Sequence, residues 1–560
     1  MGTDRRARRA VPAALVLALL LGVAACGGGS TDGTTAAAAG AGADVTLPSE
    51  GPPRSGGTLR YALASESDGW NPTVNRWAGD GTEVGLTIFD PLAAYDAEGM
   101  AVPYLAEAFV PNADFTEWTI RLRPGVRFHN GQPLDAGAVI RAIEGHQQSP
   151  LTRNAIAPVS GVSAPDPLTV VVTMREPWSS FPVVLTGQAG AVPAPAQLDD
   201  PDSSRHPIGT GPFRFVSWTP DKELVVERNP DYWRRDEAGQ PLPYLDRIVF
   251  RPITDDSQRV NALETGDVDM TWTSAATSVK RLRDLAGQGR IQLVEQHGQT
   301  EVSFVMLNLA APPFDNLHAR RAIATATDAR SWVDVIAEGV TQPAYTLFRP
   351  GSRWYSDIRL PAFDLESARA EVAAYQEATG QPLSFTLSVG ATSTARQQGE
   401  FLKAAWEQVG MRVDIKQVEA STYILDGVLG NYQAILWAQF GSPDPDYEQV
   451  WWLSETSAPV GSISLNFPRH EDPATDAALT RARSTQDVDE RKAAYDEVQR
   501  RFAEDIPYVW LDYSQPVIGA STSVRGITNG PLPDGQASWP MGGPGSFSMV
   551  TRLTQTWLTG

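Results

Sequence analysis

Residues that carry covalent chemistry or bind metals are scarce in this chain. It contains one Cys, Cys26, and six His among 560 residues. A single Cys cannot form an internal disulfide bond, and it excludes metal sites built from several thiolates. The chain has no Gly-x-Ser-x-Gly elbow and no His-Glu-x-x-His motif, because His470-Glu471 lacks a second His. We therefore predict that the protein is not an enzyme and has no catalytic residue, metal site or cofactor.

Cys26 instead lies at the end of a predicted secretory signal. An Arg-rich stretch at 5–9, an apolar run at 11–21 and the small residues Ala24-Ala25 precede it. The apolar run is too short to cross a bilayer of about 30 Å. A cysteine after small residues resembles the lipobox of bacterial lipoproteins, whose thiol is acylated. We expect residues 1–25 to be a signal peptide, exported by the general secretory or the twin-arginine route, and Cys26 to be the lipidation site.

The composition predicts an acidic body on a flexible tether. Residues 26–55 hold the cysteine and a Gly/Ala/Ser/Thr-rich stretch without aromatic residues, which cannot bury enough surface to fold. Once the four Arg and one Asp of residues 1–25 are removed, the remaining charge is −23. Such a body is a poor ligand for nucleic acid and for anionic lipid headgroups. Attachment to the outer face of the cell membrane, in the periplasmic space or its equivalent, therefore depends on the lipid.

Alternating strand and helix patterns beyond the tether predict α/β lobes. A length of 560 residues exceeds what one hydrophobic core serves, so we expect more than one lobe. Strand patterns occur at 57–63, 118–122, 168–174, 224–227, 247–250, 383–389 and 412–418. Helical patterns occur at 136–146, 257–264, 365–376, 394–409 and 487–504.

Four segments together resemble the extracellular solute-binding proteins of family 5, the peptide- and nickel-type binding subunits of ABC importers. Each segment alone is weak evidence for the family, but the order of the four along the chain is specific to it. They are Trp118–Leu134 with its Phe128-His129-Asn130-Gly131 turn, Pro207–Phe213 followed by Asn229–Trp233, Ala262–Asp269, and Arg320-Arg321-Ala322-Ile323 with Ala326–Arg330.

Most of these residues have an ordinary structural explanation. Phe128, Tyr232 and Trp233 are expected in the core, and His129 is expected to form hydrogen bonds rather than to bind a metal. Glycines in Gly209-Thr210-Gly211 suit a segment where two backbones approach closely. The motifs therefore identify the fold and say little about the ligand.

The resemblance implies a fold of two α/β lobes joined by a hinge, of the type II periplasmic-binding-protein kind with an inserted subdomain. Closure of the lobes around a solute is then the working motion. The expected boundaries are 56–88, 206–299 and 509–560 for the first lobe, 89–205 for the inserted subdomain, and 300–508 for the second lobe.

A strand that ends in a Pro-rich turn, Tyr432–Asp446, is the most informative part of the expected cleft. In peptide-binding relatives an aspartate shortly after the tryptophan captures the peptide amino group, whereas this chain has Phe440-Gly441 there. Asp444 is a possible substitute, and capping of a turn is its alternative role. The predicted ligand-binding residues are Phe304, Asn308, Trp437, Phe440, Gly441, Asp444 and Asn466.

The resemblance implies a monomeric lipoprotein that captures a small solute, a peptide or a peptide-like molecule, and delivers it to ABC permease subunits. Two alternatives remain open at this point. One is a binding protein for another solute, such as an oligosaccharide, haem or a metal chelate. The other is a surface protein with a structural or signalling role, which has no need to close on a ligand.

Overall fold

Two large β-sheets organise the described part of the chain. The structure is a computed structural model that describes residues 43–46, 51–77, 79–149, 152–296, 301–439, 441–541 and 550–560. The predicted signal peptide, Cys26 and Phe440 lie outside these residues. None of the helices in these ranges combines the length and apolar character that a membrane span needs.

The first sheet has eight strands in the order β1-β13-β20-β12-β2-β11-β10-β9. Its central strand, β2, is the strand predicted from residue 57, and it pairs in parallel with β11 and β12. Parallel neighbours require crossover connections, and helix α4 connects β11 to β12. In chain order the strands are β1 (Ala43–Val45), β2 (Thr58–Leu63), β9 (Phe213–Thr219), β10 (Glu223–Arg228), β11 (Arg247–Pro252), β12 (Met270–Thr273), β13 (Ile291–Gln296) and β20 (Val517–Ser521).

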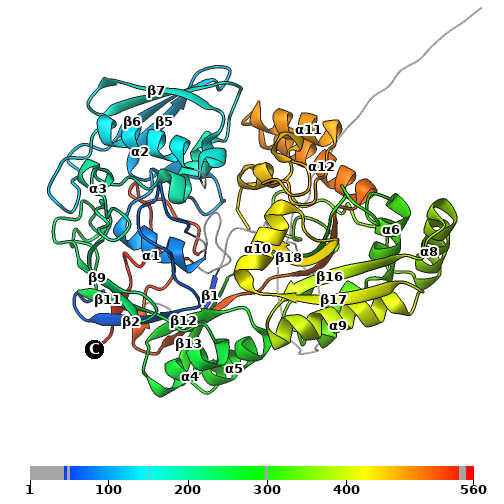
Figure 1. Ribbon diagram of the computed structural model, residues 1–560. Helices are drawn as coiled ribbons and strands as arrows, with labels where there is room; N and C mark the ends of the chain where they lie inside the picture. The colour runs from blue at the N-terminus through cyan, green and yellow to red at the C-terminus, as the bar shows by residue number, and fades with distance from the viewer. Residues whose placement is uncertain are drawn as a thin grey trace, which may run out of the picture. The chain divides into compact units, whose positions relative to one another are not determined.

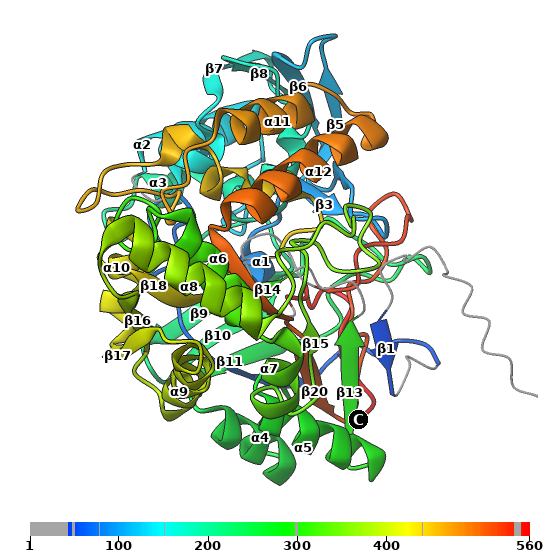
Figure 2. The same cartoon turned by 90° about the vertical axis from the view of Figure 1, so that its right-hand side faces the viewer.

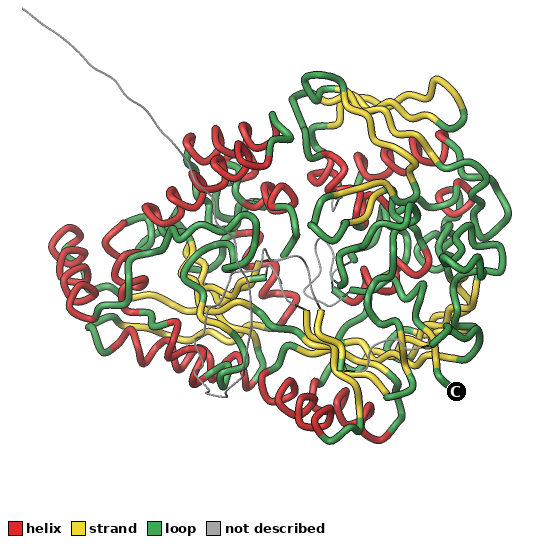
Figure 3. Tube along the Cα trace, turned by 180° about the vertical axis from the view of Figure 1, so that it is seen from behind, coloured by secondary structure: helices red, strands yellow, loops and turns green. Residues whose placement is uncertain are grey.

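Helices α4 (Asp256–Thr265) and α5 (Ala276–Gly287) cover one face of this sheet (Figures 1 and 3). Their buried residues, including Val260 and Leu282, pack with Ala62 of β2 and Leu293 of β13. The remaining elements of this part are α1 (Asp80–Ile88) and the antiparallel pair β21 (Val524–Arg525) and β22 (Trp557–Leu558), whereas α3 (Pro195–Leu198) belongs to the segment 89–205.

Strand β1 differs from the prediction of a tether over residues 26–55. Ala43–Val45 pairs antiparallel with β13, and the Thr46 hydroxyl accepts a hydrogen bond from the backbone N–H of Leu293 at 2.8 Å. Three residues at the edge of a sheet gain hydrogen bonds without burying much surface, so their composition gives no sign of a strand. The rest of the tether stays a prediction.

The second sheet has six strands in the order β15-β19-β14-β18-β16-β17. Its helices follow clear sequence signals: Asp364 caps the start of α8, Gly380 in a left-handed conformation ends it, and Thr392 caps α9. In Figure 1, α9 runs below β16 and β17. The strands are β14 (Val302–Leu307), β15 (Gln342–Pro343), β16 (Ser384–Gly390), β17 (Arg412–Val418), β18 (Ala434–Gln439) and β19 (Tyr508–Tyr513).

Helices pack against this sheet on both faces, where two apolar clusters lie. The helices are α6 (Leu317–Ala326), α7 (Ala329–Val335), α8 (Leu365–Thr379), α9 (Ser393–Glu407), α10 (Ala420–Leu429), α11 (Pro473–Arg483) and α12 (Val488–Asp505), with 3₁₀ helices η4 (Pro445–Trp451) and η5 (Ser454–Thr456).

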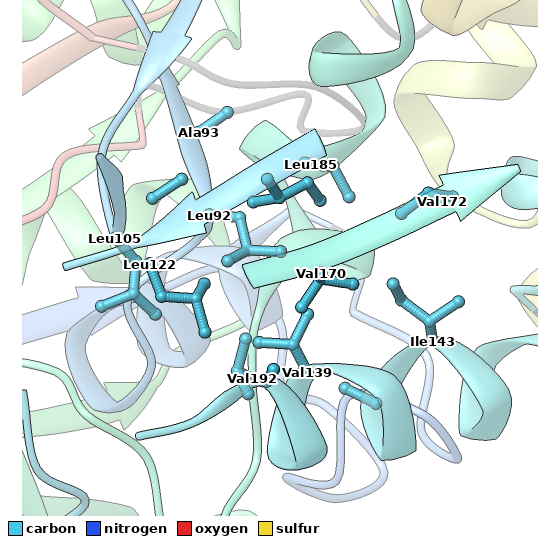
Figure 4. Packing of buried hydrophobic residues seen from close by; sticks show 14 of the residues in the cluster. Leu92, Ala93, Leu105, Leu122, Val139, Ile143, Val170, Val172, Leu185 and Val192 are labelled. Carbon is cyan, nitrogen blue, oxygen red and sulfur yellow. The ribbon is translucent and has the colours of Figure 1, made fainter. Parts of the chain in front are cut away.

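The segment 89–205, predicted to be an inserted subdomain and hereafter called the insert, has its own four-stranded sheet in the order β5-β6-β8-β7. Val139 and Ile143 of α2 face Val170 and Val172 of β8 in its core (Figure 4). Its elements are β3 (Ala93–Tyr95), β4 (Ala101–Pro103), β5 (Ala106–Pro111), β6 (Glu117–Leu122), α2 (Ala136–Gln148), η1 (Arg153–Ile156), β7 (Val159–Asp166), β8 (Thr169–Met174), η2 (Phe181–Thr186) and η3 (Gln188–Gly190).

The family motifs have structural roles, with Phe128 and Tyr232 buried in the core as predicted and Trp233 only partly buried. A Cβ on Gly209 would lie 2.1 Å from the carbonyl oxygen of Ile88, so no larger residue fits at this backbone crossing. Tyr232 donates to the buried carboxylate of Asp90 at 2.9 Å, and Trp233 donates to it at 2.8 Å. His129 Nε2 is 3.0 Å from the Gly211 carbonyl oxygen, and burial lowers the pKa of this His to about 4.

Two neighbouring chain passages connect the sheets. β13 and β20 are adjacent in the first sheet (Figure 2), and they continue into β14 and β19, which are adjacent in the second. The predicted boundary at 508/509 is therefore wrong, because β19 belongs to the six-stranded sheet and the chain crosses at 514–516. The sequence of a fully buried strand such as Tyr508–Tyr513 is compatible with either sheet. Only its hydrogen-bonded neighbours show which sheet it belongs to.

Candidate ligand-binding site

A small aromatic pocket lies against three neighbouring strands of the six-stranded sheet. It has a volume of about 30 Å³, which is the room that one water molecule takes up. Strands β14, β18 and β19 supply most of its wall, and η4 and the loop after η5 complete it. The lining residues are Phe304, Met306, Trp437, Ala438, Gln439, Trp451, Leu465, Phe467, Pro468 and Tyr508.

Phe304 and Trp437, both predicted, line this pocket. Phe304 is almost fully buried, and its ring centroid is 4.8 Å from that of Tyr508 at an angle of 65°. Trp437 is half-buried; it stacks on Tyr423 at 5.4 Å and meets the edge of Phe467 at 5.6 Å. Edge-to-face and offset-stacked rings hold one another in fixed orientations, so the walls are preformed.

Asp444 has the capping role rather than a place in the pocket wall. Its side chain caps η4 by accepting a hydrogen bond from the backbone N–H of Asp446 at 3.0 Å. Both carboxylate oxygens also accept from Arg491 of α12, at 2.7 and 2.8 Å, and both side chains are buried. These bonds occupy the carboxylate, so it positions η4.

Asn308 and Asn466 also act by positioning backbone. The Asn308 amide donates to the carbonyl oxygens of Gly430 and Tyr432, at 2.9 and 3.1 Å. The Asn466 amide donates to the His470 carbonyl oxygen at 2.7 Å, which fixes the loop that carries Leu465 and Phe467. Both Asn are fully buried and neither lines the pocket. Gly441 is half-buried in the turn before η4, and Phe440 lies outside the described residues.

Contacts between η4 and the insert adjoin this site. Asp446 accepts a hydrogen bond from the indole N–H of Trp178 in the insert at 2.7 Å, and it pairs with Arg483 of α11 at 2.7 Å. Burial alone would raise the pKa of Asp446, but the charge and hydrogen bond of Arg483 outweigh it and hold the pKa below its usual value. The hydroxyls of Tyr95 and Ser442 make a second contact at 3.1 Å. One seven-residue helix therefore contributes both to the pocket wall and to the contact with the insert.

Sequence reasoning missed Glu448, Trp451, Phe467 and Tyr508. The alternation Asp444-Pro445-Asp446-Tyr447-Glu448 places three acids in one short element, and this was the available signal for Glu448. The three aromatic residues come from separate segments, so only the folded chain brings them to one pocket.

One group of three potential metal ligands occurs among the described residues: His470, Asp472 and Asp505. Arg501 donates to both carboxylates, at 2.9 Å to Asp472 and 3.3 Å to Asp505. His470 Nε2 is 2.9 Å from the Asp505 carboxylate. A guanidinium already neutralises the acids, so this group forms an ion-pair network and does not fit a metal ion.

Comparisons with known proteins agree with this architecture. The chain is 26% identical over 458 residues to the glutathione-binding protein GsiB of Pectobacterium atrosepticum, covering 79% of this chain and 86% of the relative. It is 25% identical to the nickel-binding periplasmic protein of Escherichia coli, covering 80% and 87%. It is 28% identical to Protein XP55 of Streptomyces lividans, covering 88% and 93%.

Solved structures show the same fold. The periplasmic binding protein DppA from Helicobacter pylori in complex with the peptide STSA has a TM-score of 0.76 at 23% identity, covering 90% of this chain and 99% of that one. NikZ from Campylobacter jejuni in complex with Ni(L-His) has a TM-score of 0.72 at 21% identity, covering 88% and 97%. These likenesses confirm the predicted two-lobed α/β fold.

The family assignment rests on a match over most of the chain. The model of the bacterial extracellular solute-binding proteins, family 5 Middle, matches residues 101–459. The relatives named above as glutathione- and nickel-binding are binding proteins and not enzymes, in agreement with the prediction. The chain therefore belongs to family 5 of the bacterial extracellular solute-binding proteins.

Proposed function

We propose that the protein is the substrate-binding lipoprotein of an ABC importer and that it captures a peptide or peptide-like solute between its lobes. The observation that carries the proposal is the aromatic pocket on β14, β18 and β19, next to the contacts of η4 with the insert. Aromatic walls give apolar contact area to peptide side chains. A monomer presents the closed, loaded form to its permease.

In this proposal the lobes close because the solute has a higher affinity for the closed state than for the open state. A solute that touches both lobes binds the closed state more tightly than the open one, and only this difference shifts the equilibrium. The hydrogen bond from Trp178 of the insert to Asp446 of the six-stranded lobe adds a direct contact between the two parts.

A metal chelate is the second candidate for the solute. The named relatives support it, since one of them is a nickel-binding protein and another was solved with Ni(L-His). The pocket offers no free imidazole or thiolate among its lining residues, so a chelate would be held by its organic part. Oligosaccharides and haem are further candidates with apolar faces that suit aromatic walls.

Attachment to the membrane through Cys26 belongs to the same proposal. Its support is the position of the only cysteine after Ala24-Ala25 and the strongly acidic body that follows. A single tethered protein near its permease keeps the captured solute close to the site of uptake.

Thermal unfolding in the presence of a solute panel tests the function. The purified mature protein is heated alone and with short peptides, oligosaccharides, haem and nickel chelates. A true ligand at 100 times its Kd stabilises the protein by about 2.7 kcal/mol and reduces its scattering radius. If no solute raises the melting temperature, the importer function is contradicted and a structural or signalling surface role is favoured.

A further inference from the structure

Three carboxylates at alternate positions of η4 and its cap have different partners. Asp444 pairs with Arg491, and Asp446 pairs with Arg483. Glu448 is only 3% exposed, and the neutral side chain of Gln439 is the hydrogen-bonding partner that its carboxylate has among the described residues. No ion pair of these residues includes it, so Glu448 is a buried acid without a counter-ion.

Glu448 lies beside the aromatic pocket. Trp451 follows it by three residues on a 3₁₀ helix, where side chains three positions apart lie on the same side, and Trp451 lines the pocket. Burial raises the pKa of Tyr508, another lining residue, and electrostatic interactions with Tyr432 and Glu448 raise it further. Glu448 therefore lies directly behind the pocket wall, next to the lining residues Gln439 and Tyr508.

The surroundings of Glu448 favour a positively charged ligand group. Burial raises the pKa of Glu448 well above its usual value, and the nearby side chain of Gln439 offsets this only in part. An ionised carboxylate in such a place is costly unless a cation accompanies it. Aromatic faces attract cations as well, most strongly where water is excluded.

The size of the pocket selects among cations. Its volume of about 30 Å³ matches one water-sized group, and a primary ammonium has that size. We propose that this pocket binds a primary ammonium group of the solute, with Glu448 as its counter-ion and Trp437, Trp451 and Tyr508 as its walls. The proposal rests on the solute-binding function above and narrows its substrate class to amines.

Matched pairs of probes test the proposal by isothermal titration calorimetry. Ala-Ala-Ala against its N-acetylated form tests a peptide amino terminus. N-acetyl-Ala-Lys-Ala against N-acetyl-Ala-norleucine-Ala tests a side-chain amine, and cadaverine tests a non-peptide amine. We expect at least one of the three amines to bind the wild-type protein. Its Kd should be about tenfold or more lower than that of its uncharged partner probe. For cadaverine the uncharged partner is 1,5-pentanediol.

Glu448→Gln is the test variant and Glu471→Gln, an exposed acid of the same lobe, is the matched control. Glu448→Gln should reduce the preference to about twofold or less, because its amide cannot neutralise the ammonium. Glu471→Gln should keep the wild-type preference. An unchanged preference in Glu448→Gln overturns the proposal.

The wild type provides a test that does not depend on the folding of a variant. Burial raises the pKa of Glu448 and an ammonium beside the carboxyl lowers it again, so amine binding should be accompanied by proton release, which calorimetry at pH 7 in buffers of different ionisation enthalpy measures. Among the residues that the structure describes, Tyr447 and Tyr508 interact electrostatically with Glu448, and burial raises the pKa of both above their usual values, so neither should contribute at this pH. Amine binding without proton release overturns the proposal.

The two proposals fail in different ways. If uncharged members of the panel bind and none of the amines is preferred, the ammonium site is wrong and the importer function stands. If no member of the panel binds at all, both proposals are wrong.

Discussion

Arg491 and Asp444 form a buried bidentate ion pair, with Nη1 at 2.8 Å from one carboxylate oxygen and Nη2 at 2.7 Å from the other. The Arg491 guanidinium also lies over the ring of Trp354 at 5.1 Å. Burial alone would lower the pKa of Arg491, but the charge of Asp444 raises it well above its usual value. The pair therefore connects α12 to the start of η4.

Asp444→Asn should destabilise the protein by about 3–5 kcal/mol, because it leaves the Arg491 charge buried without a partner. Urea unfolding monitored by circular dichroism measures the loss. Glu497→Gln is the control, since its pair with Arg500 is exposed and contributes about 0–1 kcal/mol. Equal stabilities of the two variants would contradict a structural role for Asp444.

Trp178→Phe should weaken closure. The substitution removes the hydrogen bond to Asp446, and a bond to a charged group contributes about 1.5–3 kcal/mol. We expect solute affinity to fall about tenfold and the scattering radius at partial saturation to rise. Trp70→Phe is the matched control, because Trp70 is equally buried and its indole N–H has no partner among the described residues. Equal affinities of the two variants would show that the contact does not stabilise the closed state.

His146→Gln should make the protein less sensitive to acid. Burial lowers the pKa of His146 to about 4, so the folded state resists protonation while the unfolded chain takes up a proton near pH 6.5. Stability from this group is complete above pH 6.5 and falls by about 3 kcal/mol as the pH drops to 4. Denaturant unfolding at pH 4.5 and 7 should show a smaller difference in the variant than in wild type. His206→Gln, an exposed His, should keep the wild-type difference.

Cys26→Ala should release the protein from the membrane into the medium or the soluble fraction. The acidic body has no affinity for anionic headgroups, so the acyl chains on Cys26 are the expected anchor. Fractionation of cells that express the variant and the wild type measures the change. Unchanged membrane association of the variant would contradict lipidation at this residue.

Regular elements could be predicted closely because their signals are local. The helix expected at 394–409 is α9 (Ser393–Glu407), and the strand expected at 118–122 is β6 (Glu117–Leu122). Apolar spacing and caps lie within the segment itself, so no distant residue has to be known. The boundary at 508/509 depends on which sheet β19 joins. The sequence of a buried strand does not indicate which strands it pairs with.

Ligand binding by the seven predicted residues stays a prediction. Phe304 and Trp437 line the aromatic pocket, whereas Asn308, Asp444 and Asn466 hold backbone and helix ends in place. Arg491 lies 47 residues from Asp444 along the chain, and Arg483 lies 37 residues from Asp446. The packing of α11 and α12 therefore decides which of the three acids has no ion-pair partner. A local sequence pattern cannot predict this.

The two adjacent chain passages between the sheets have a consequence for how such a protein adapts. Ser514 donates to the Glu301 carbonyl oxygen at 3.1 Å, which joins the second passage to the start of β14. We expect substitutions at 514–516 to change the fraction of molecules in the binding-competent state, which would scale the apparent Kd for every solute by the same factor. Substitutions in the pocket instead change the ratio of affinities between solutes. Overall affinity and discrimination between solutes can therefore evolve independently in this protein.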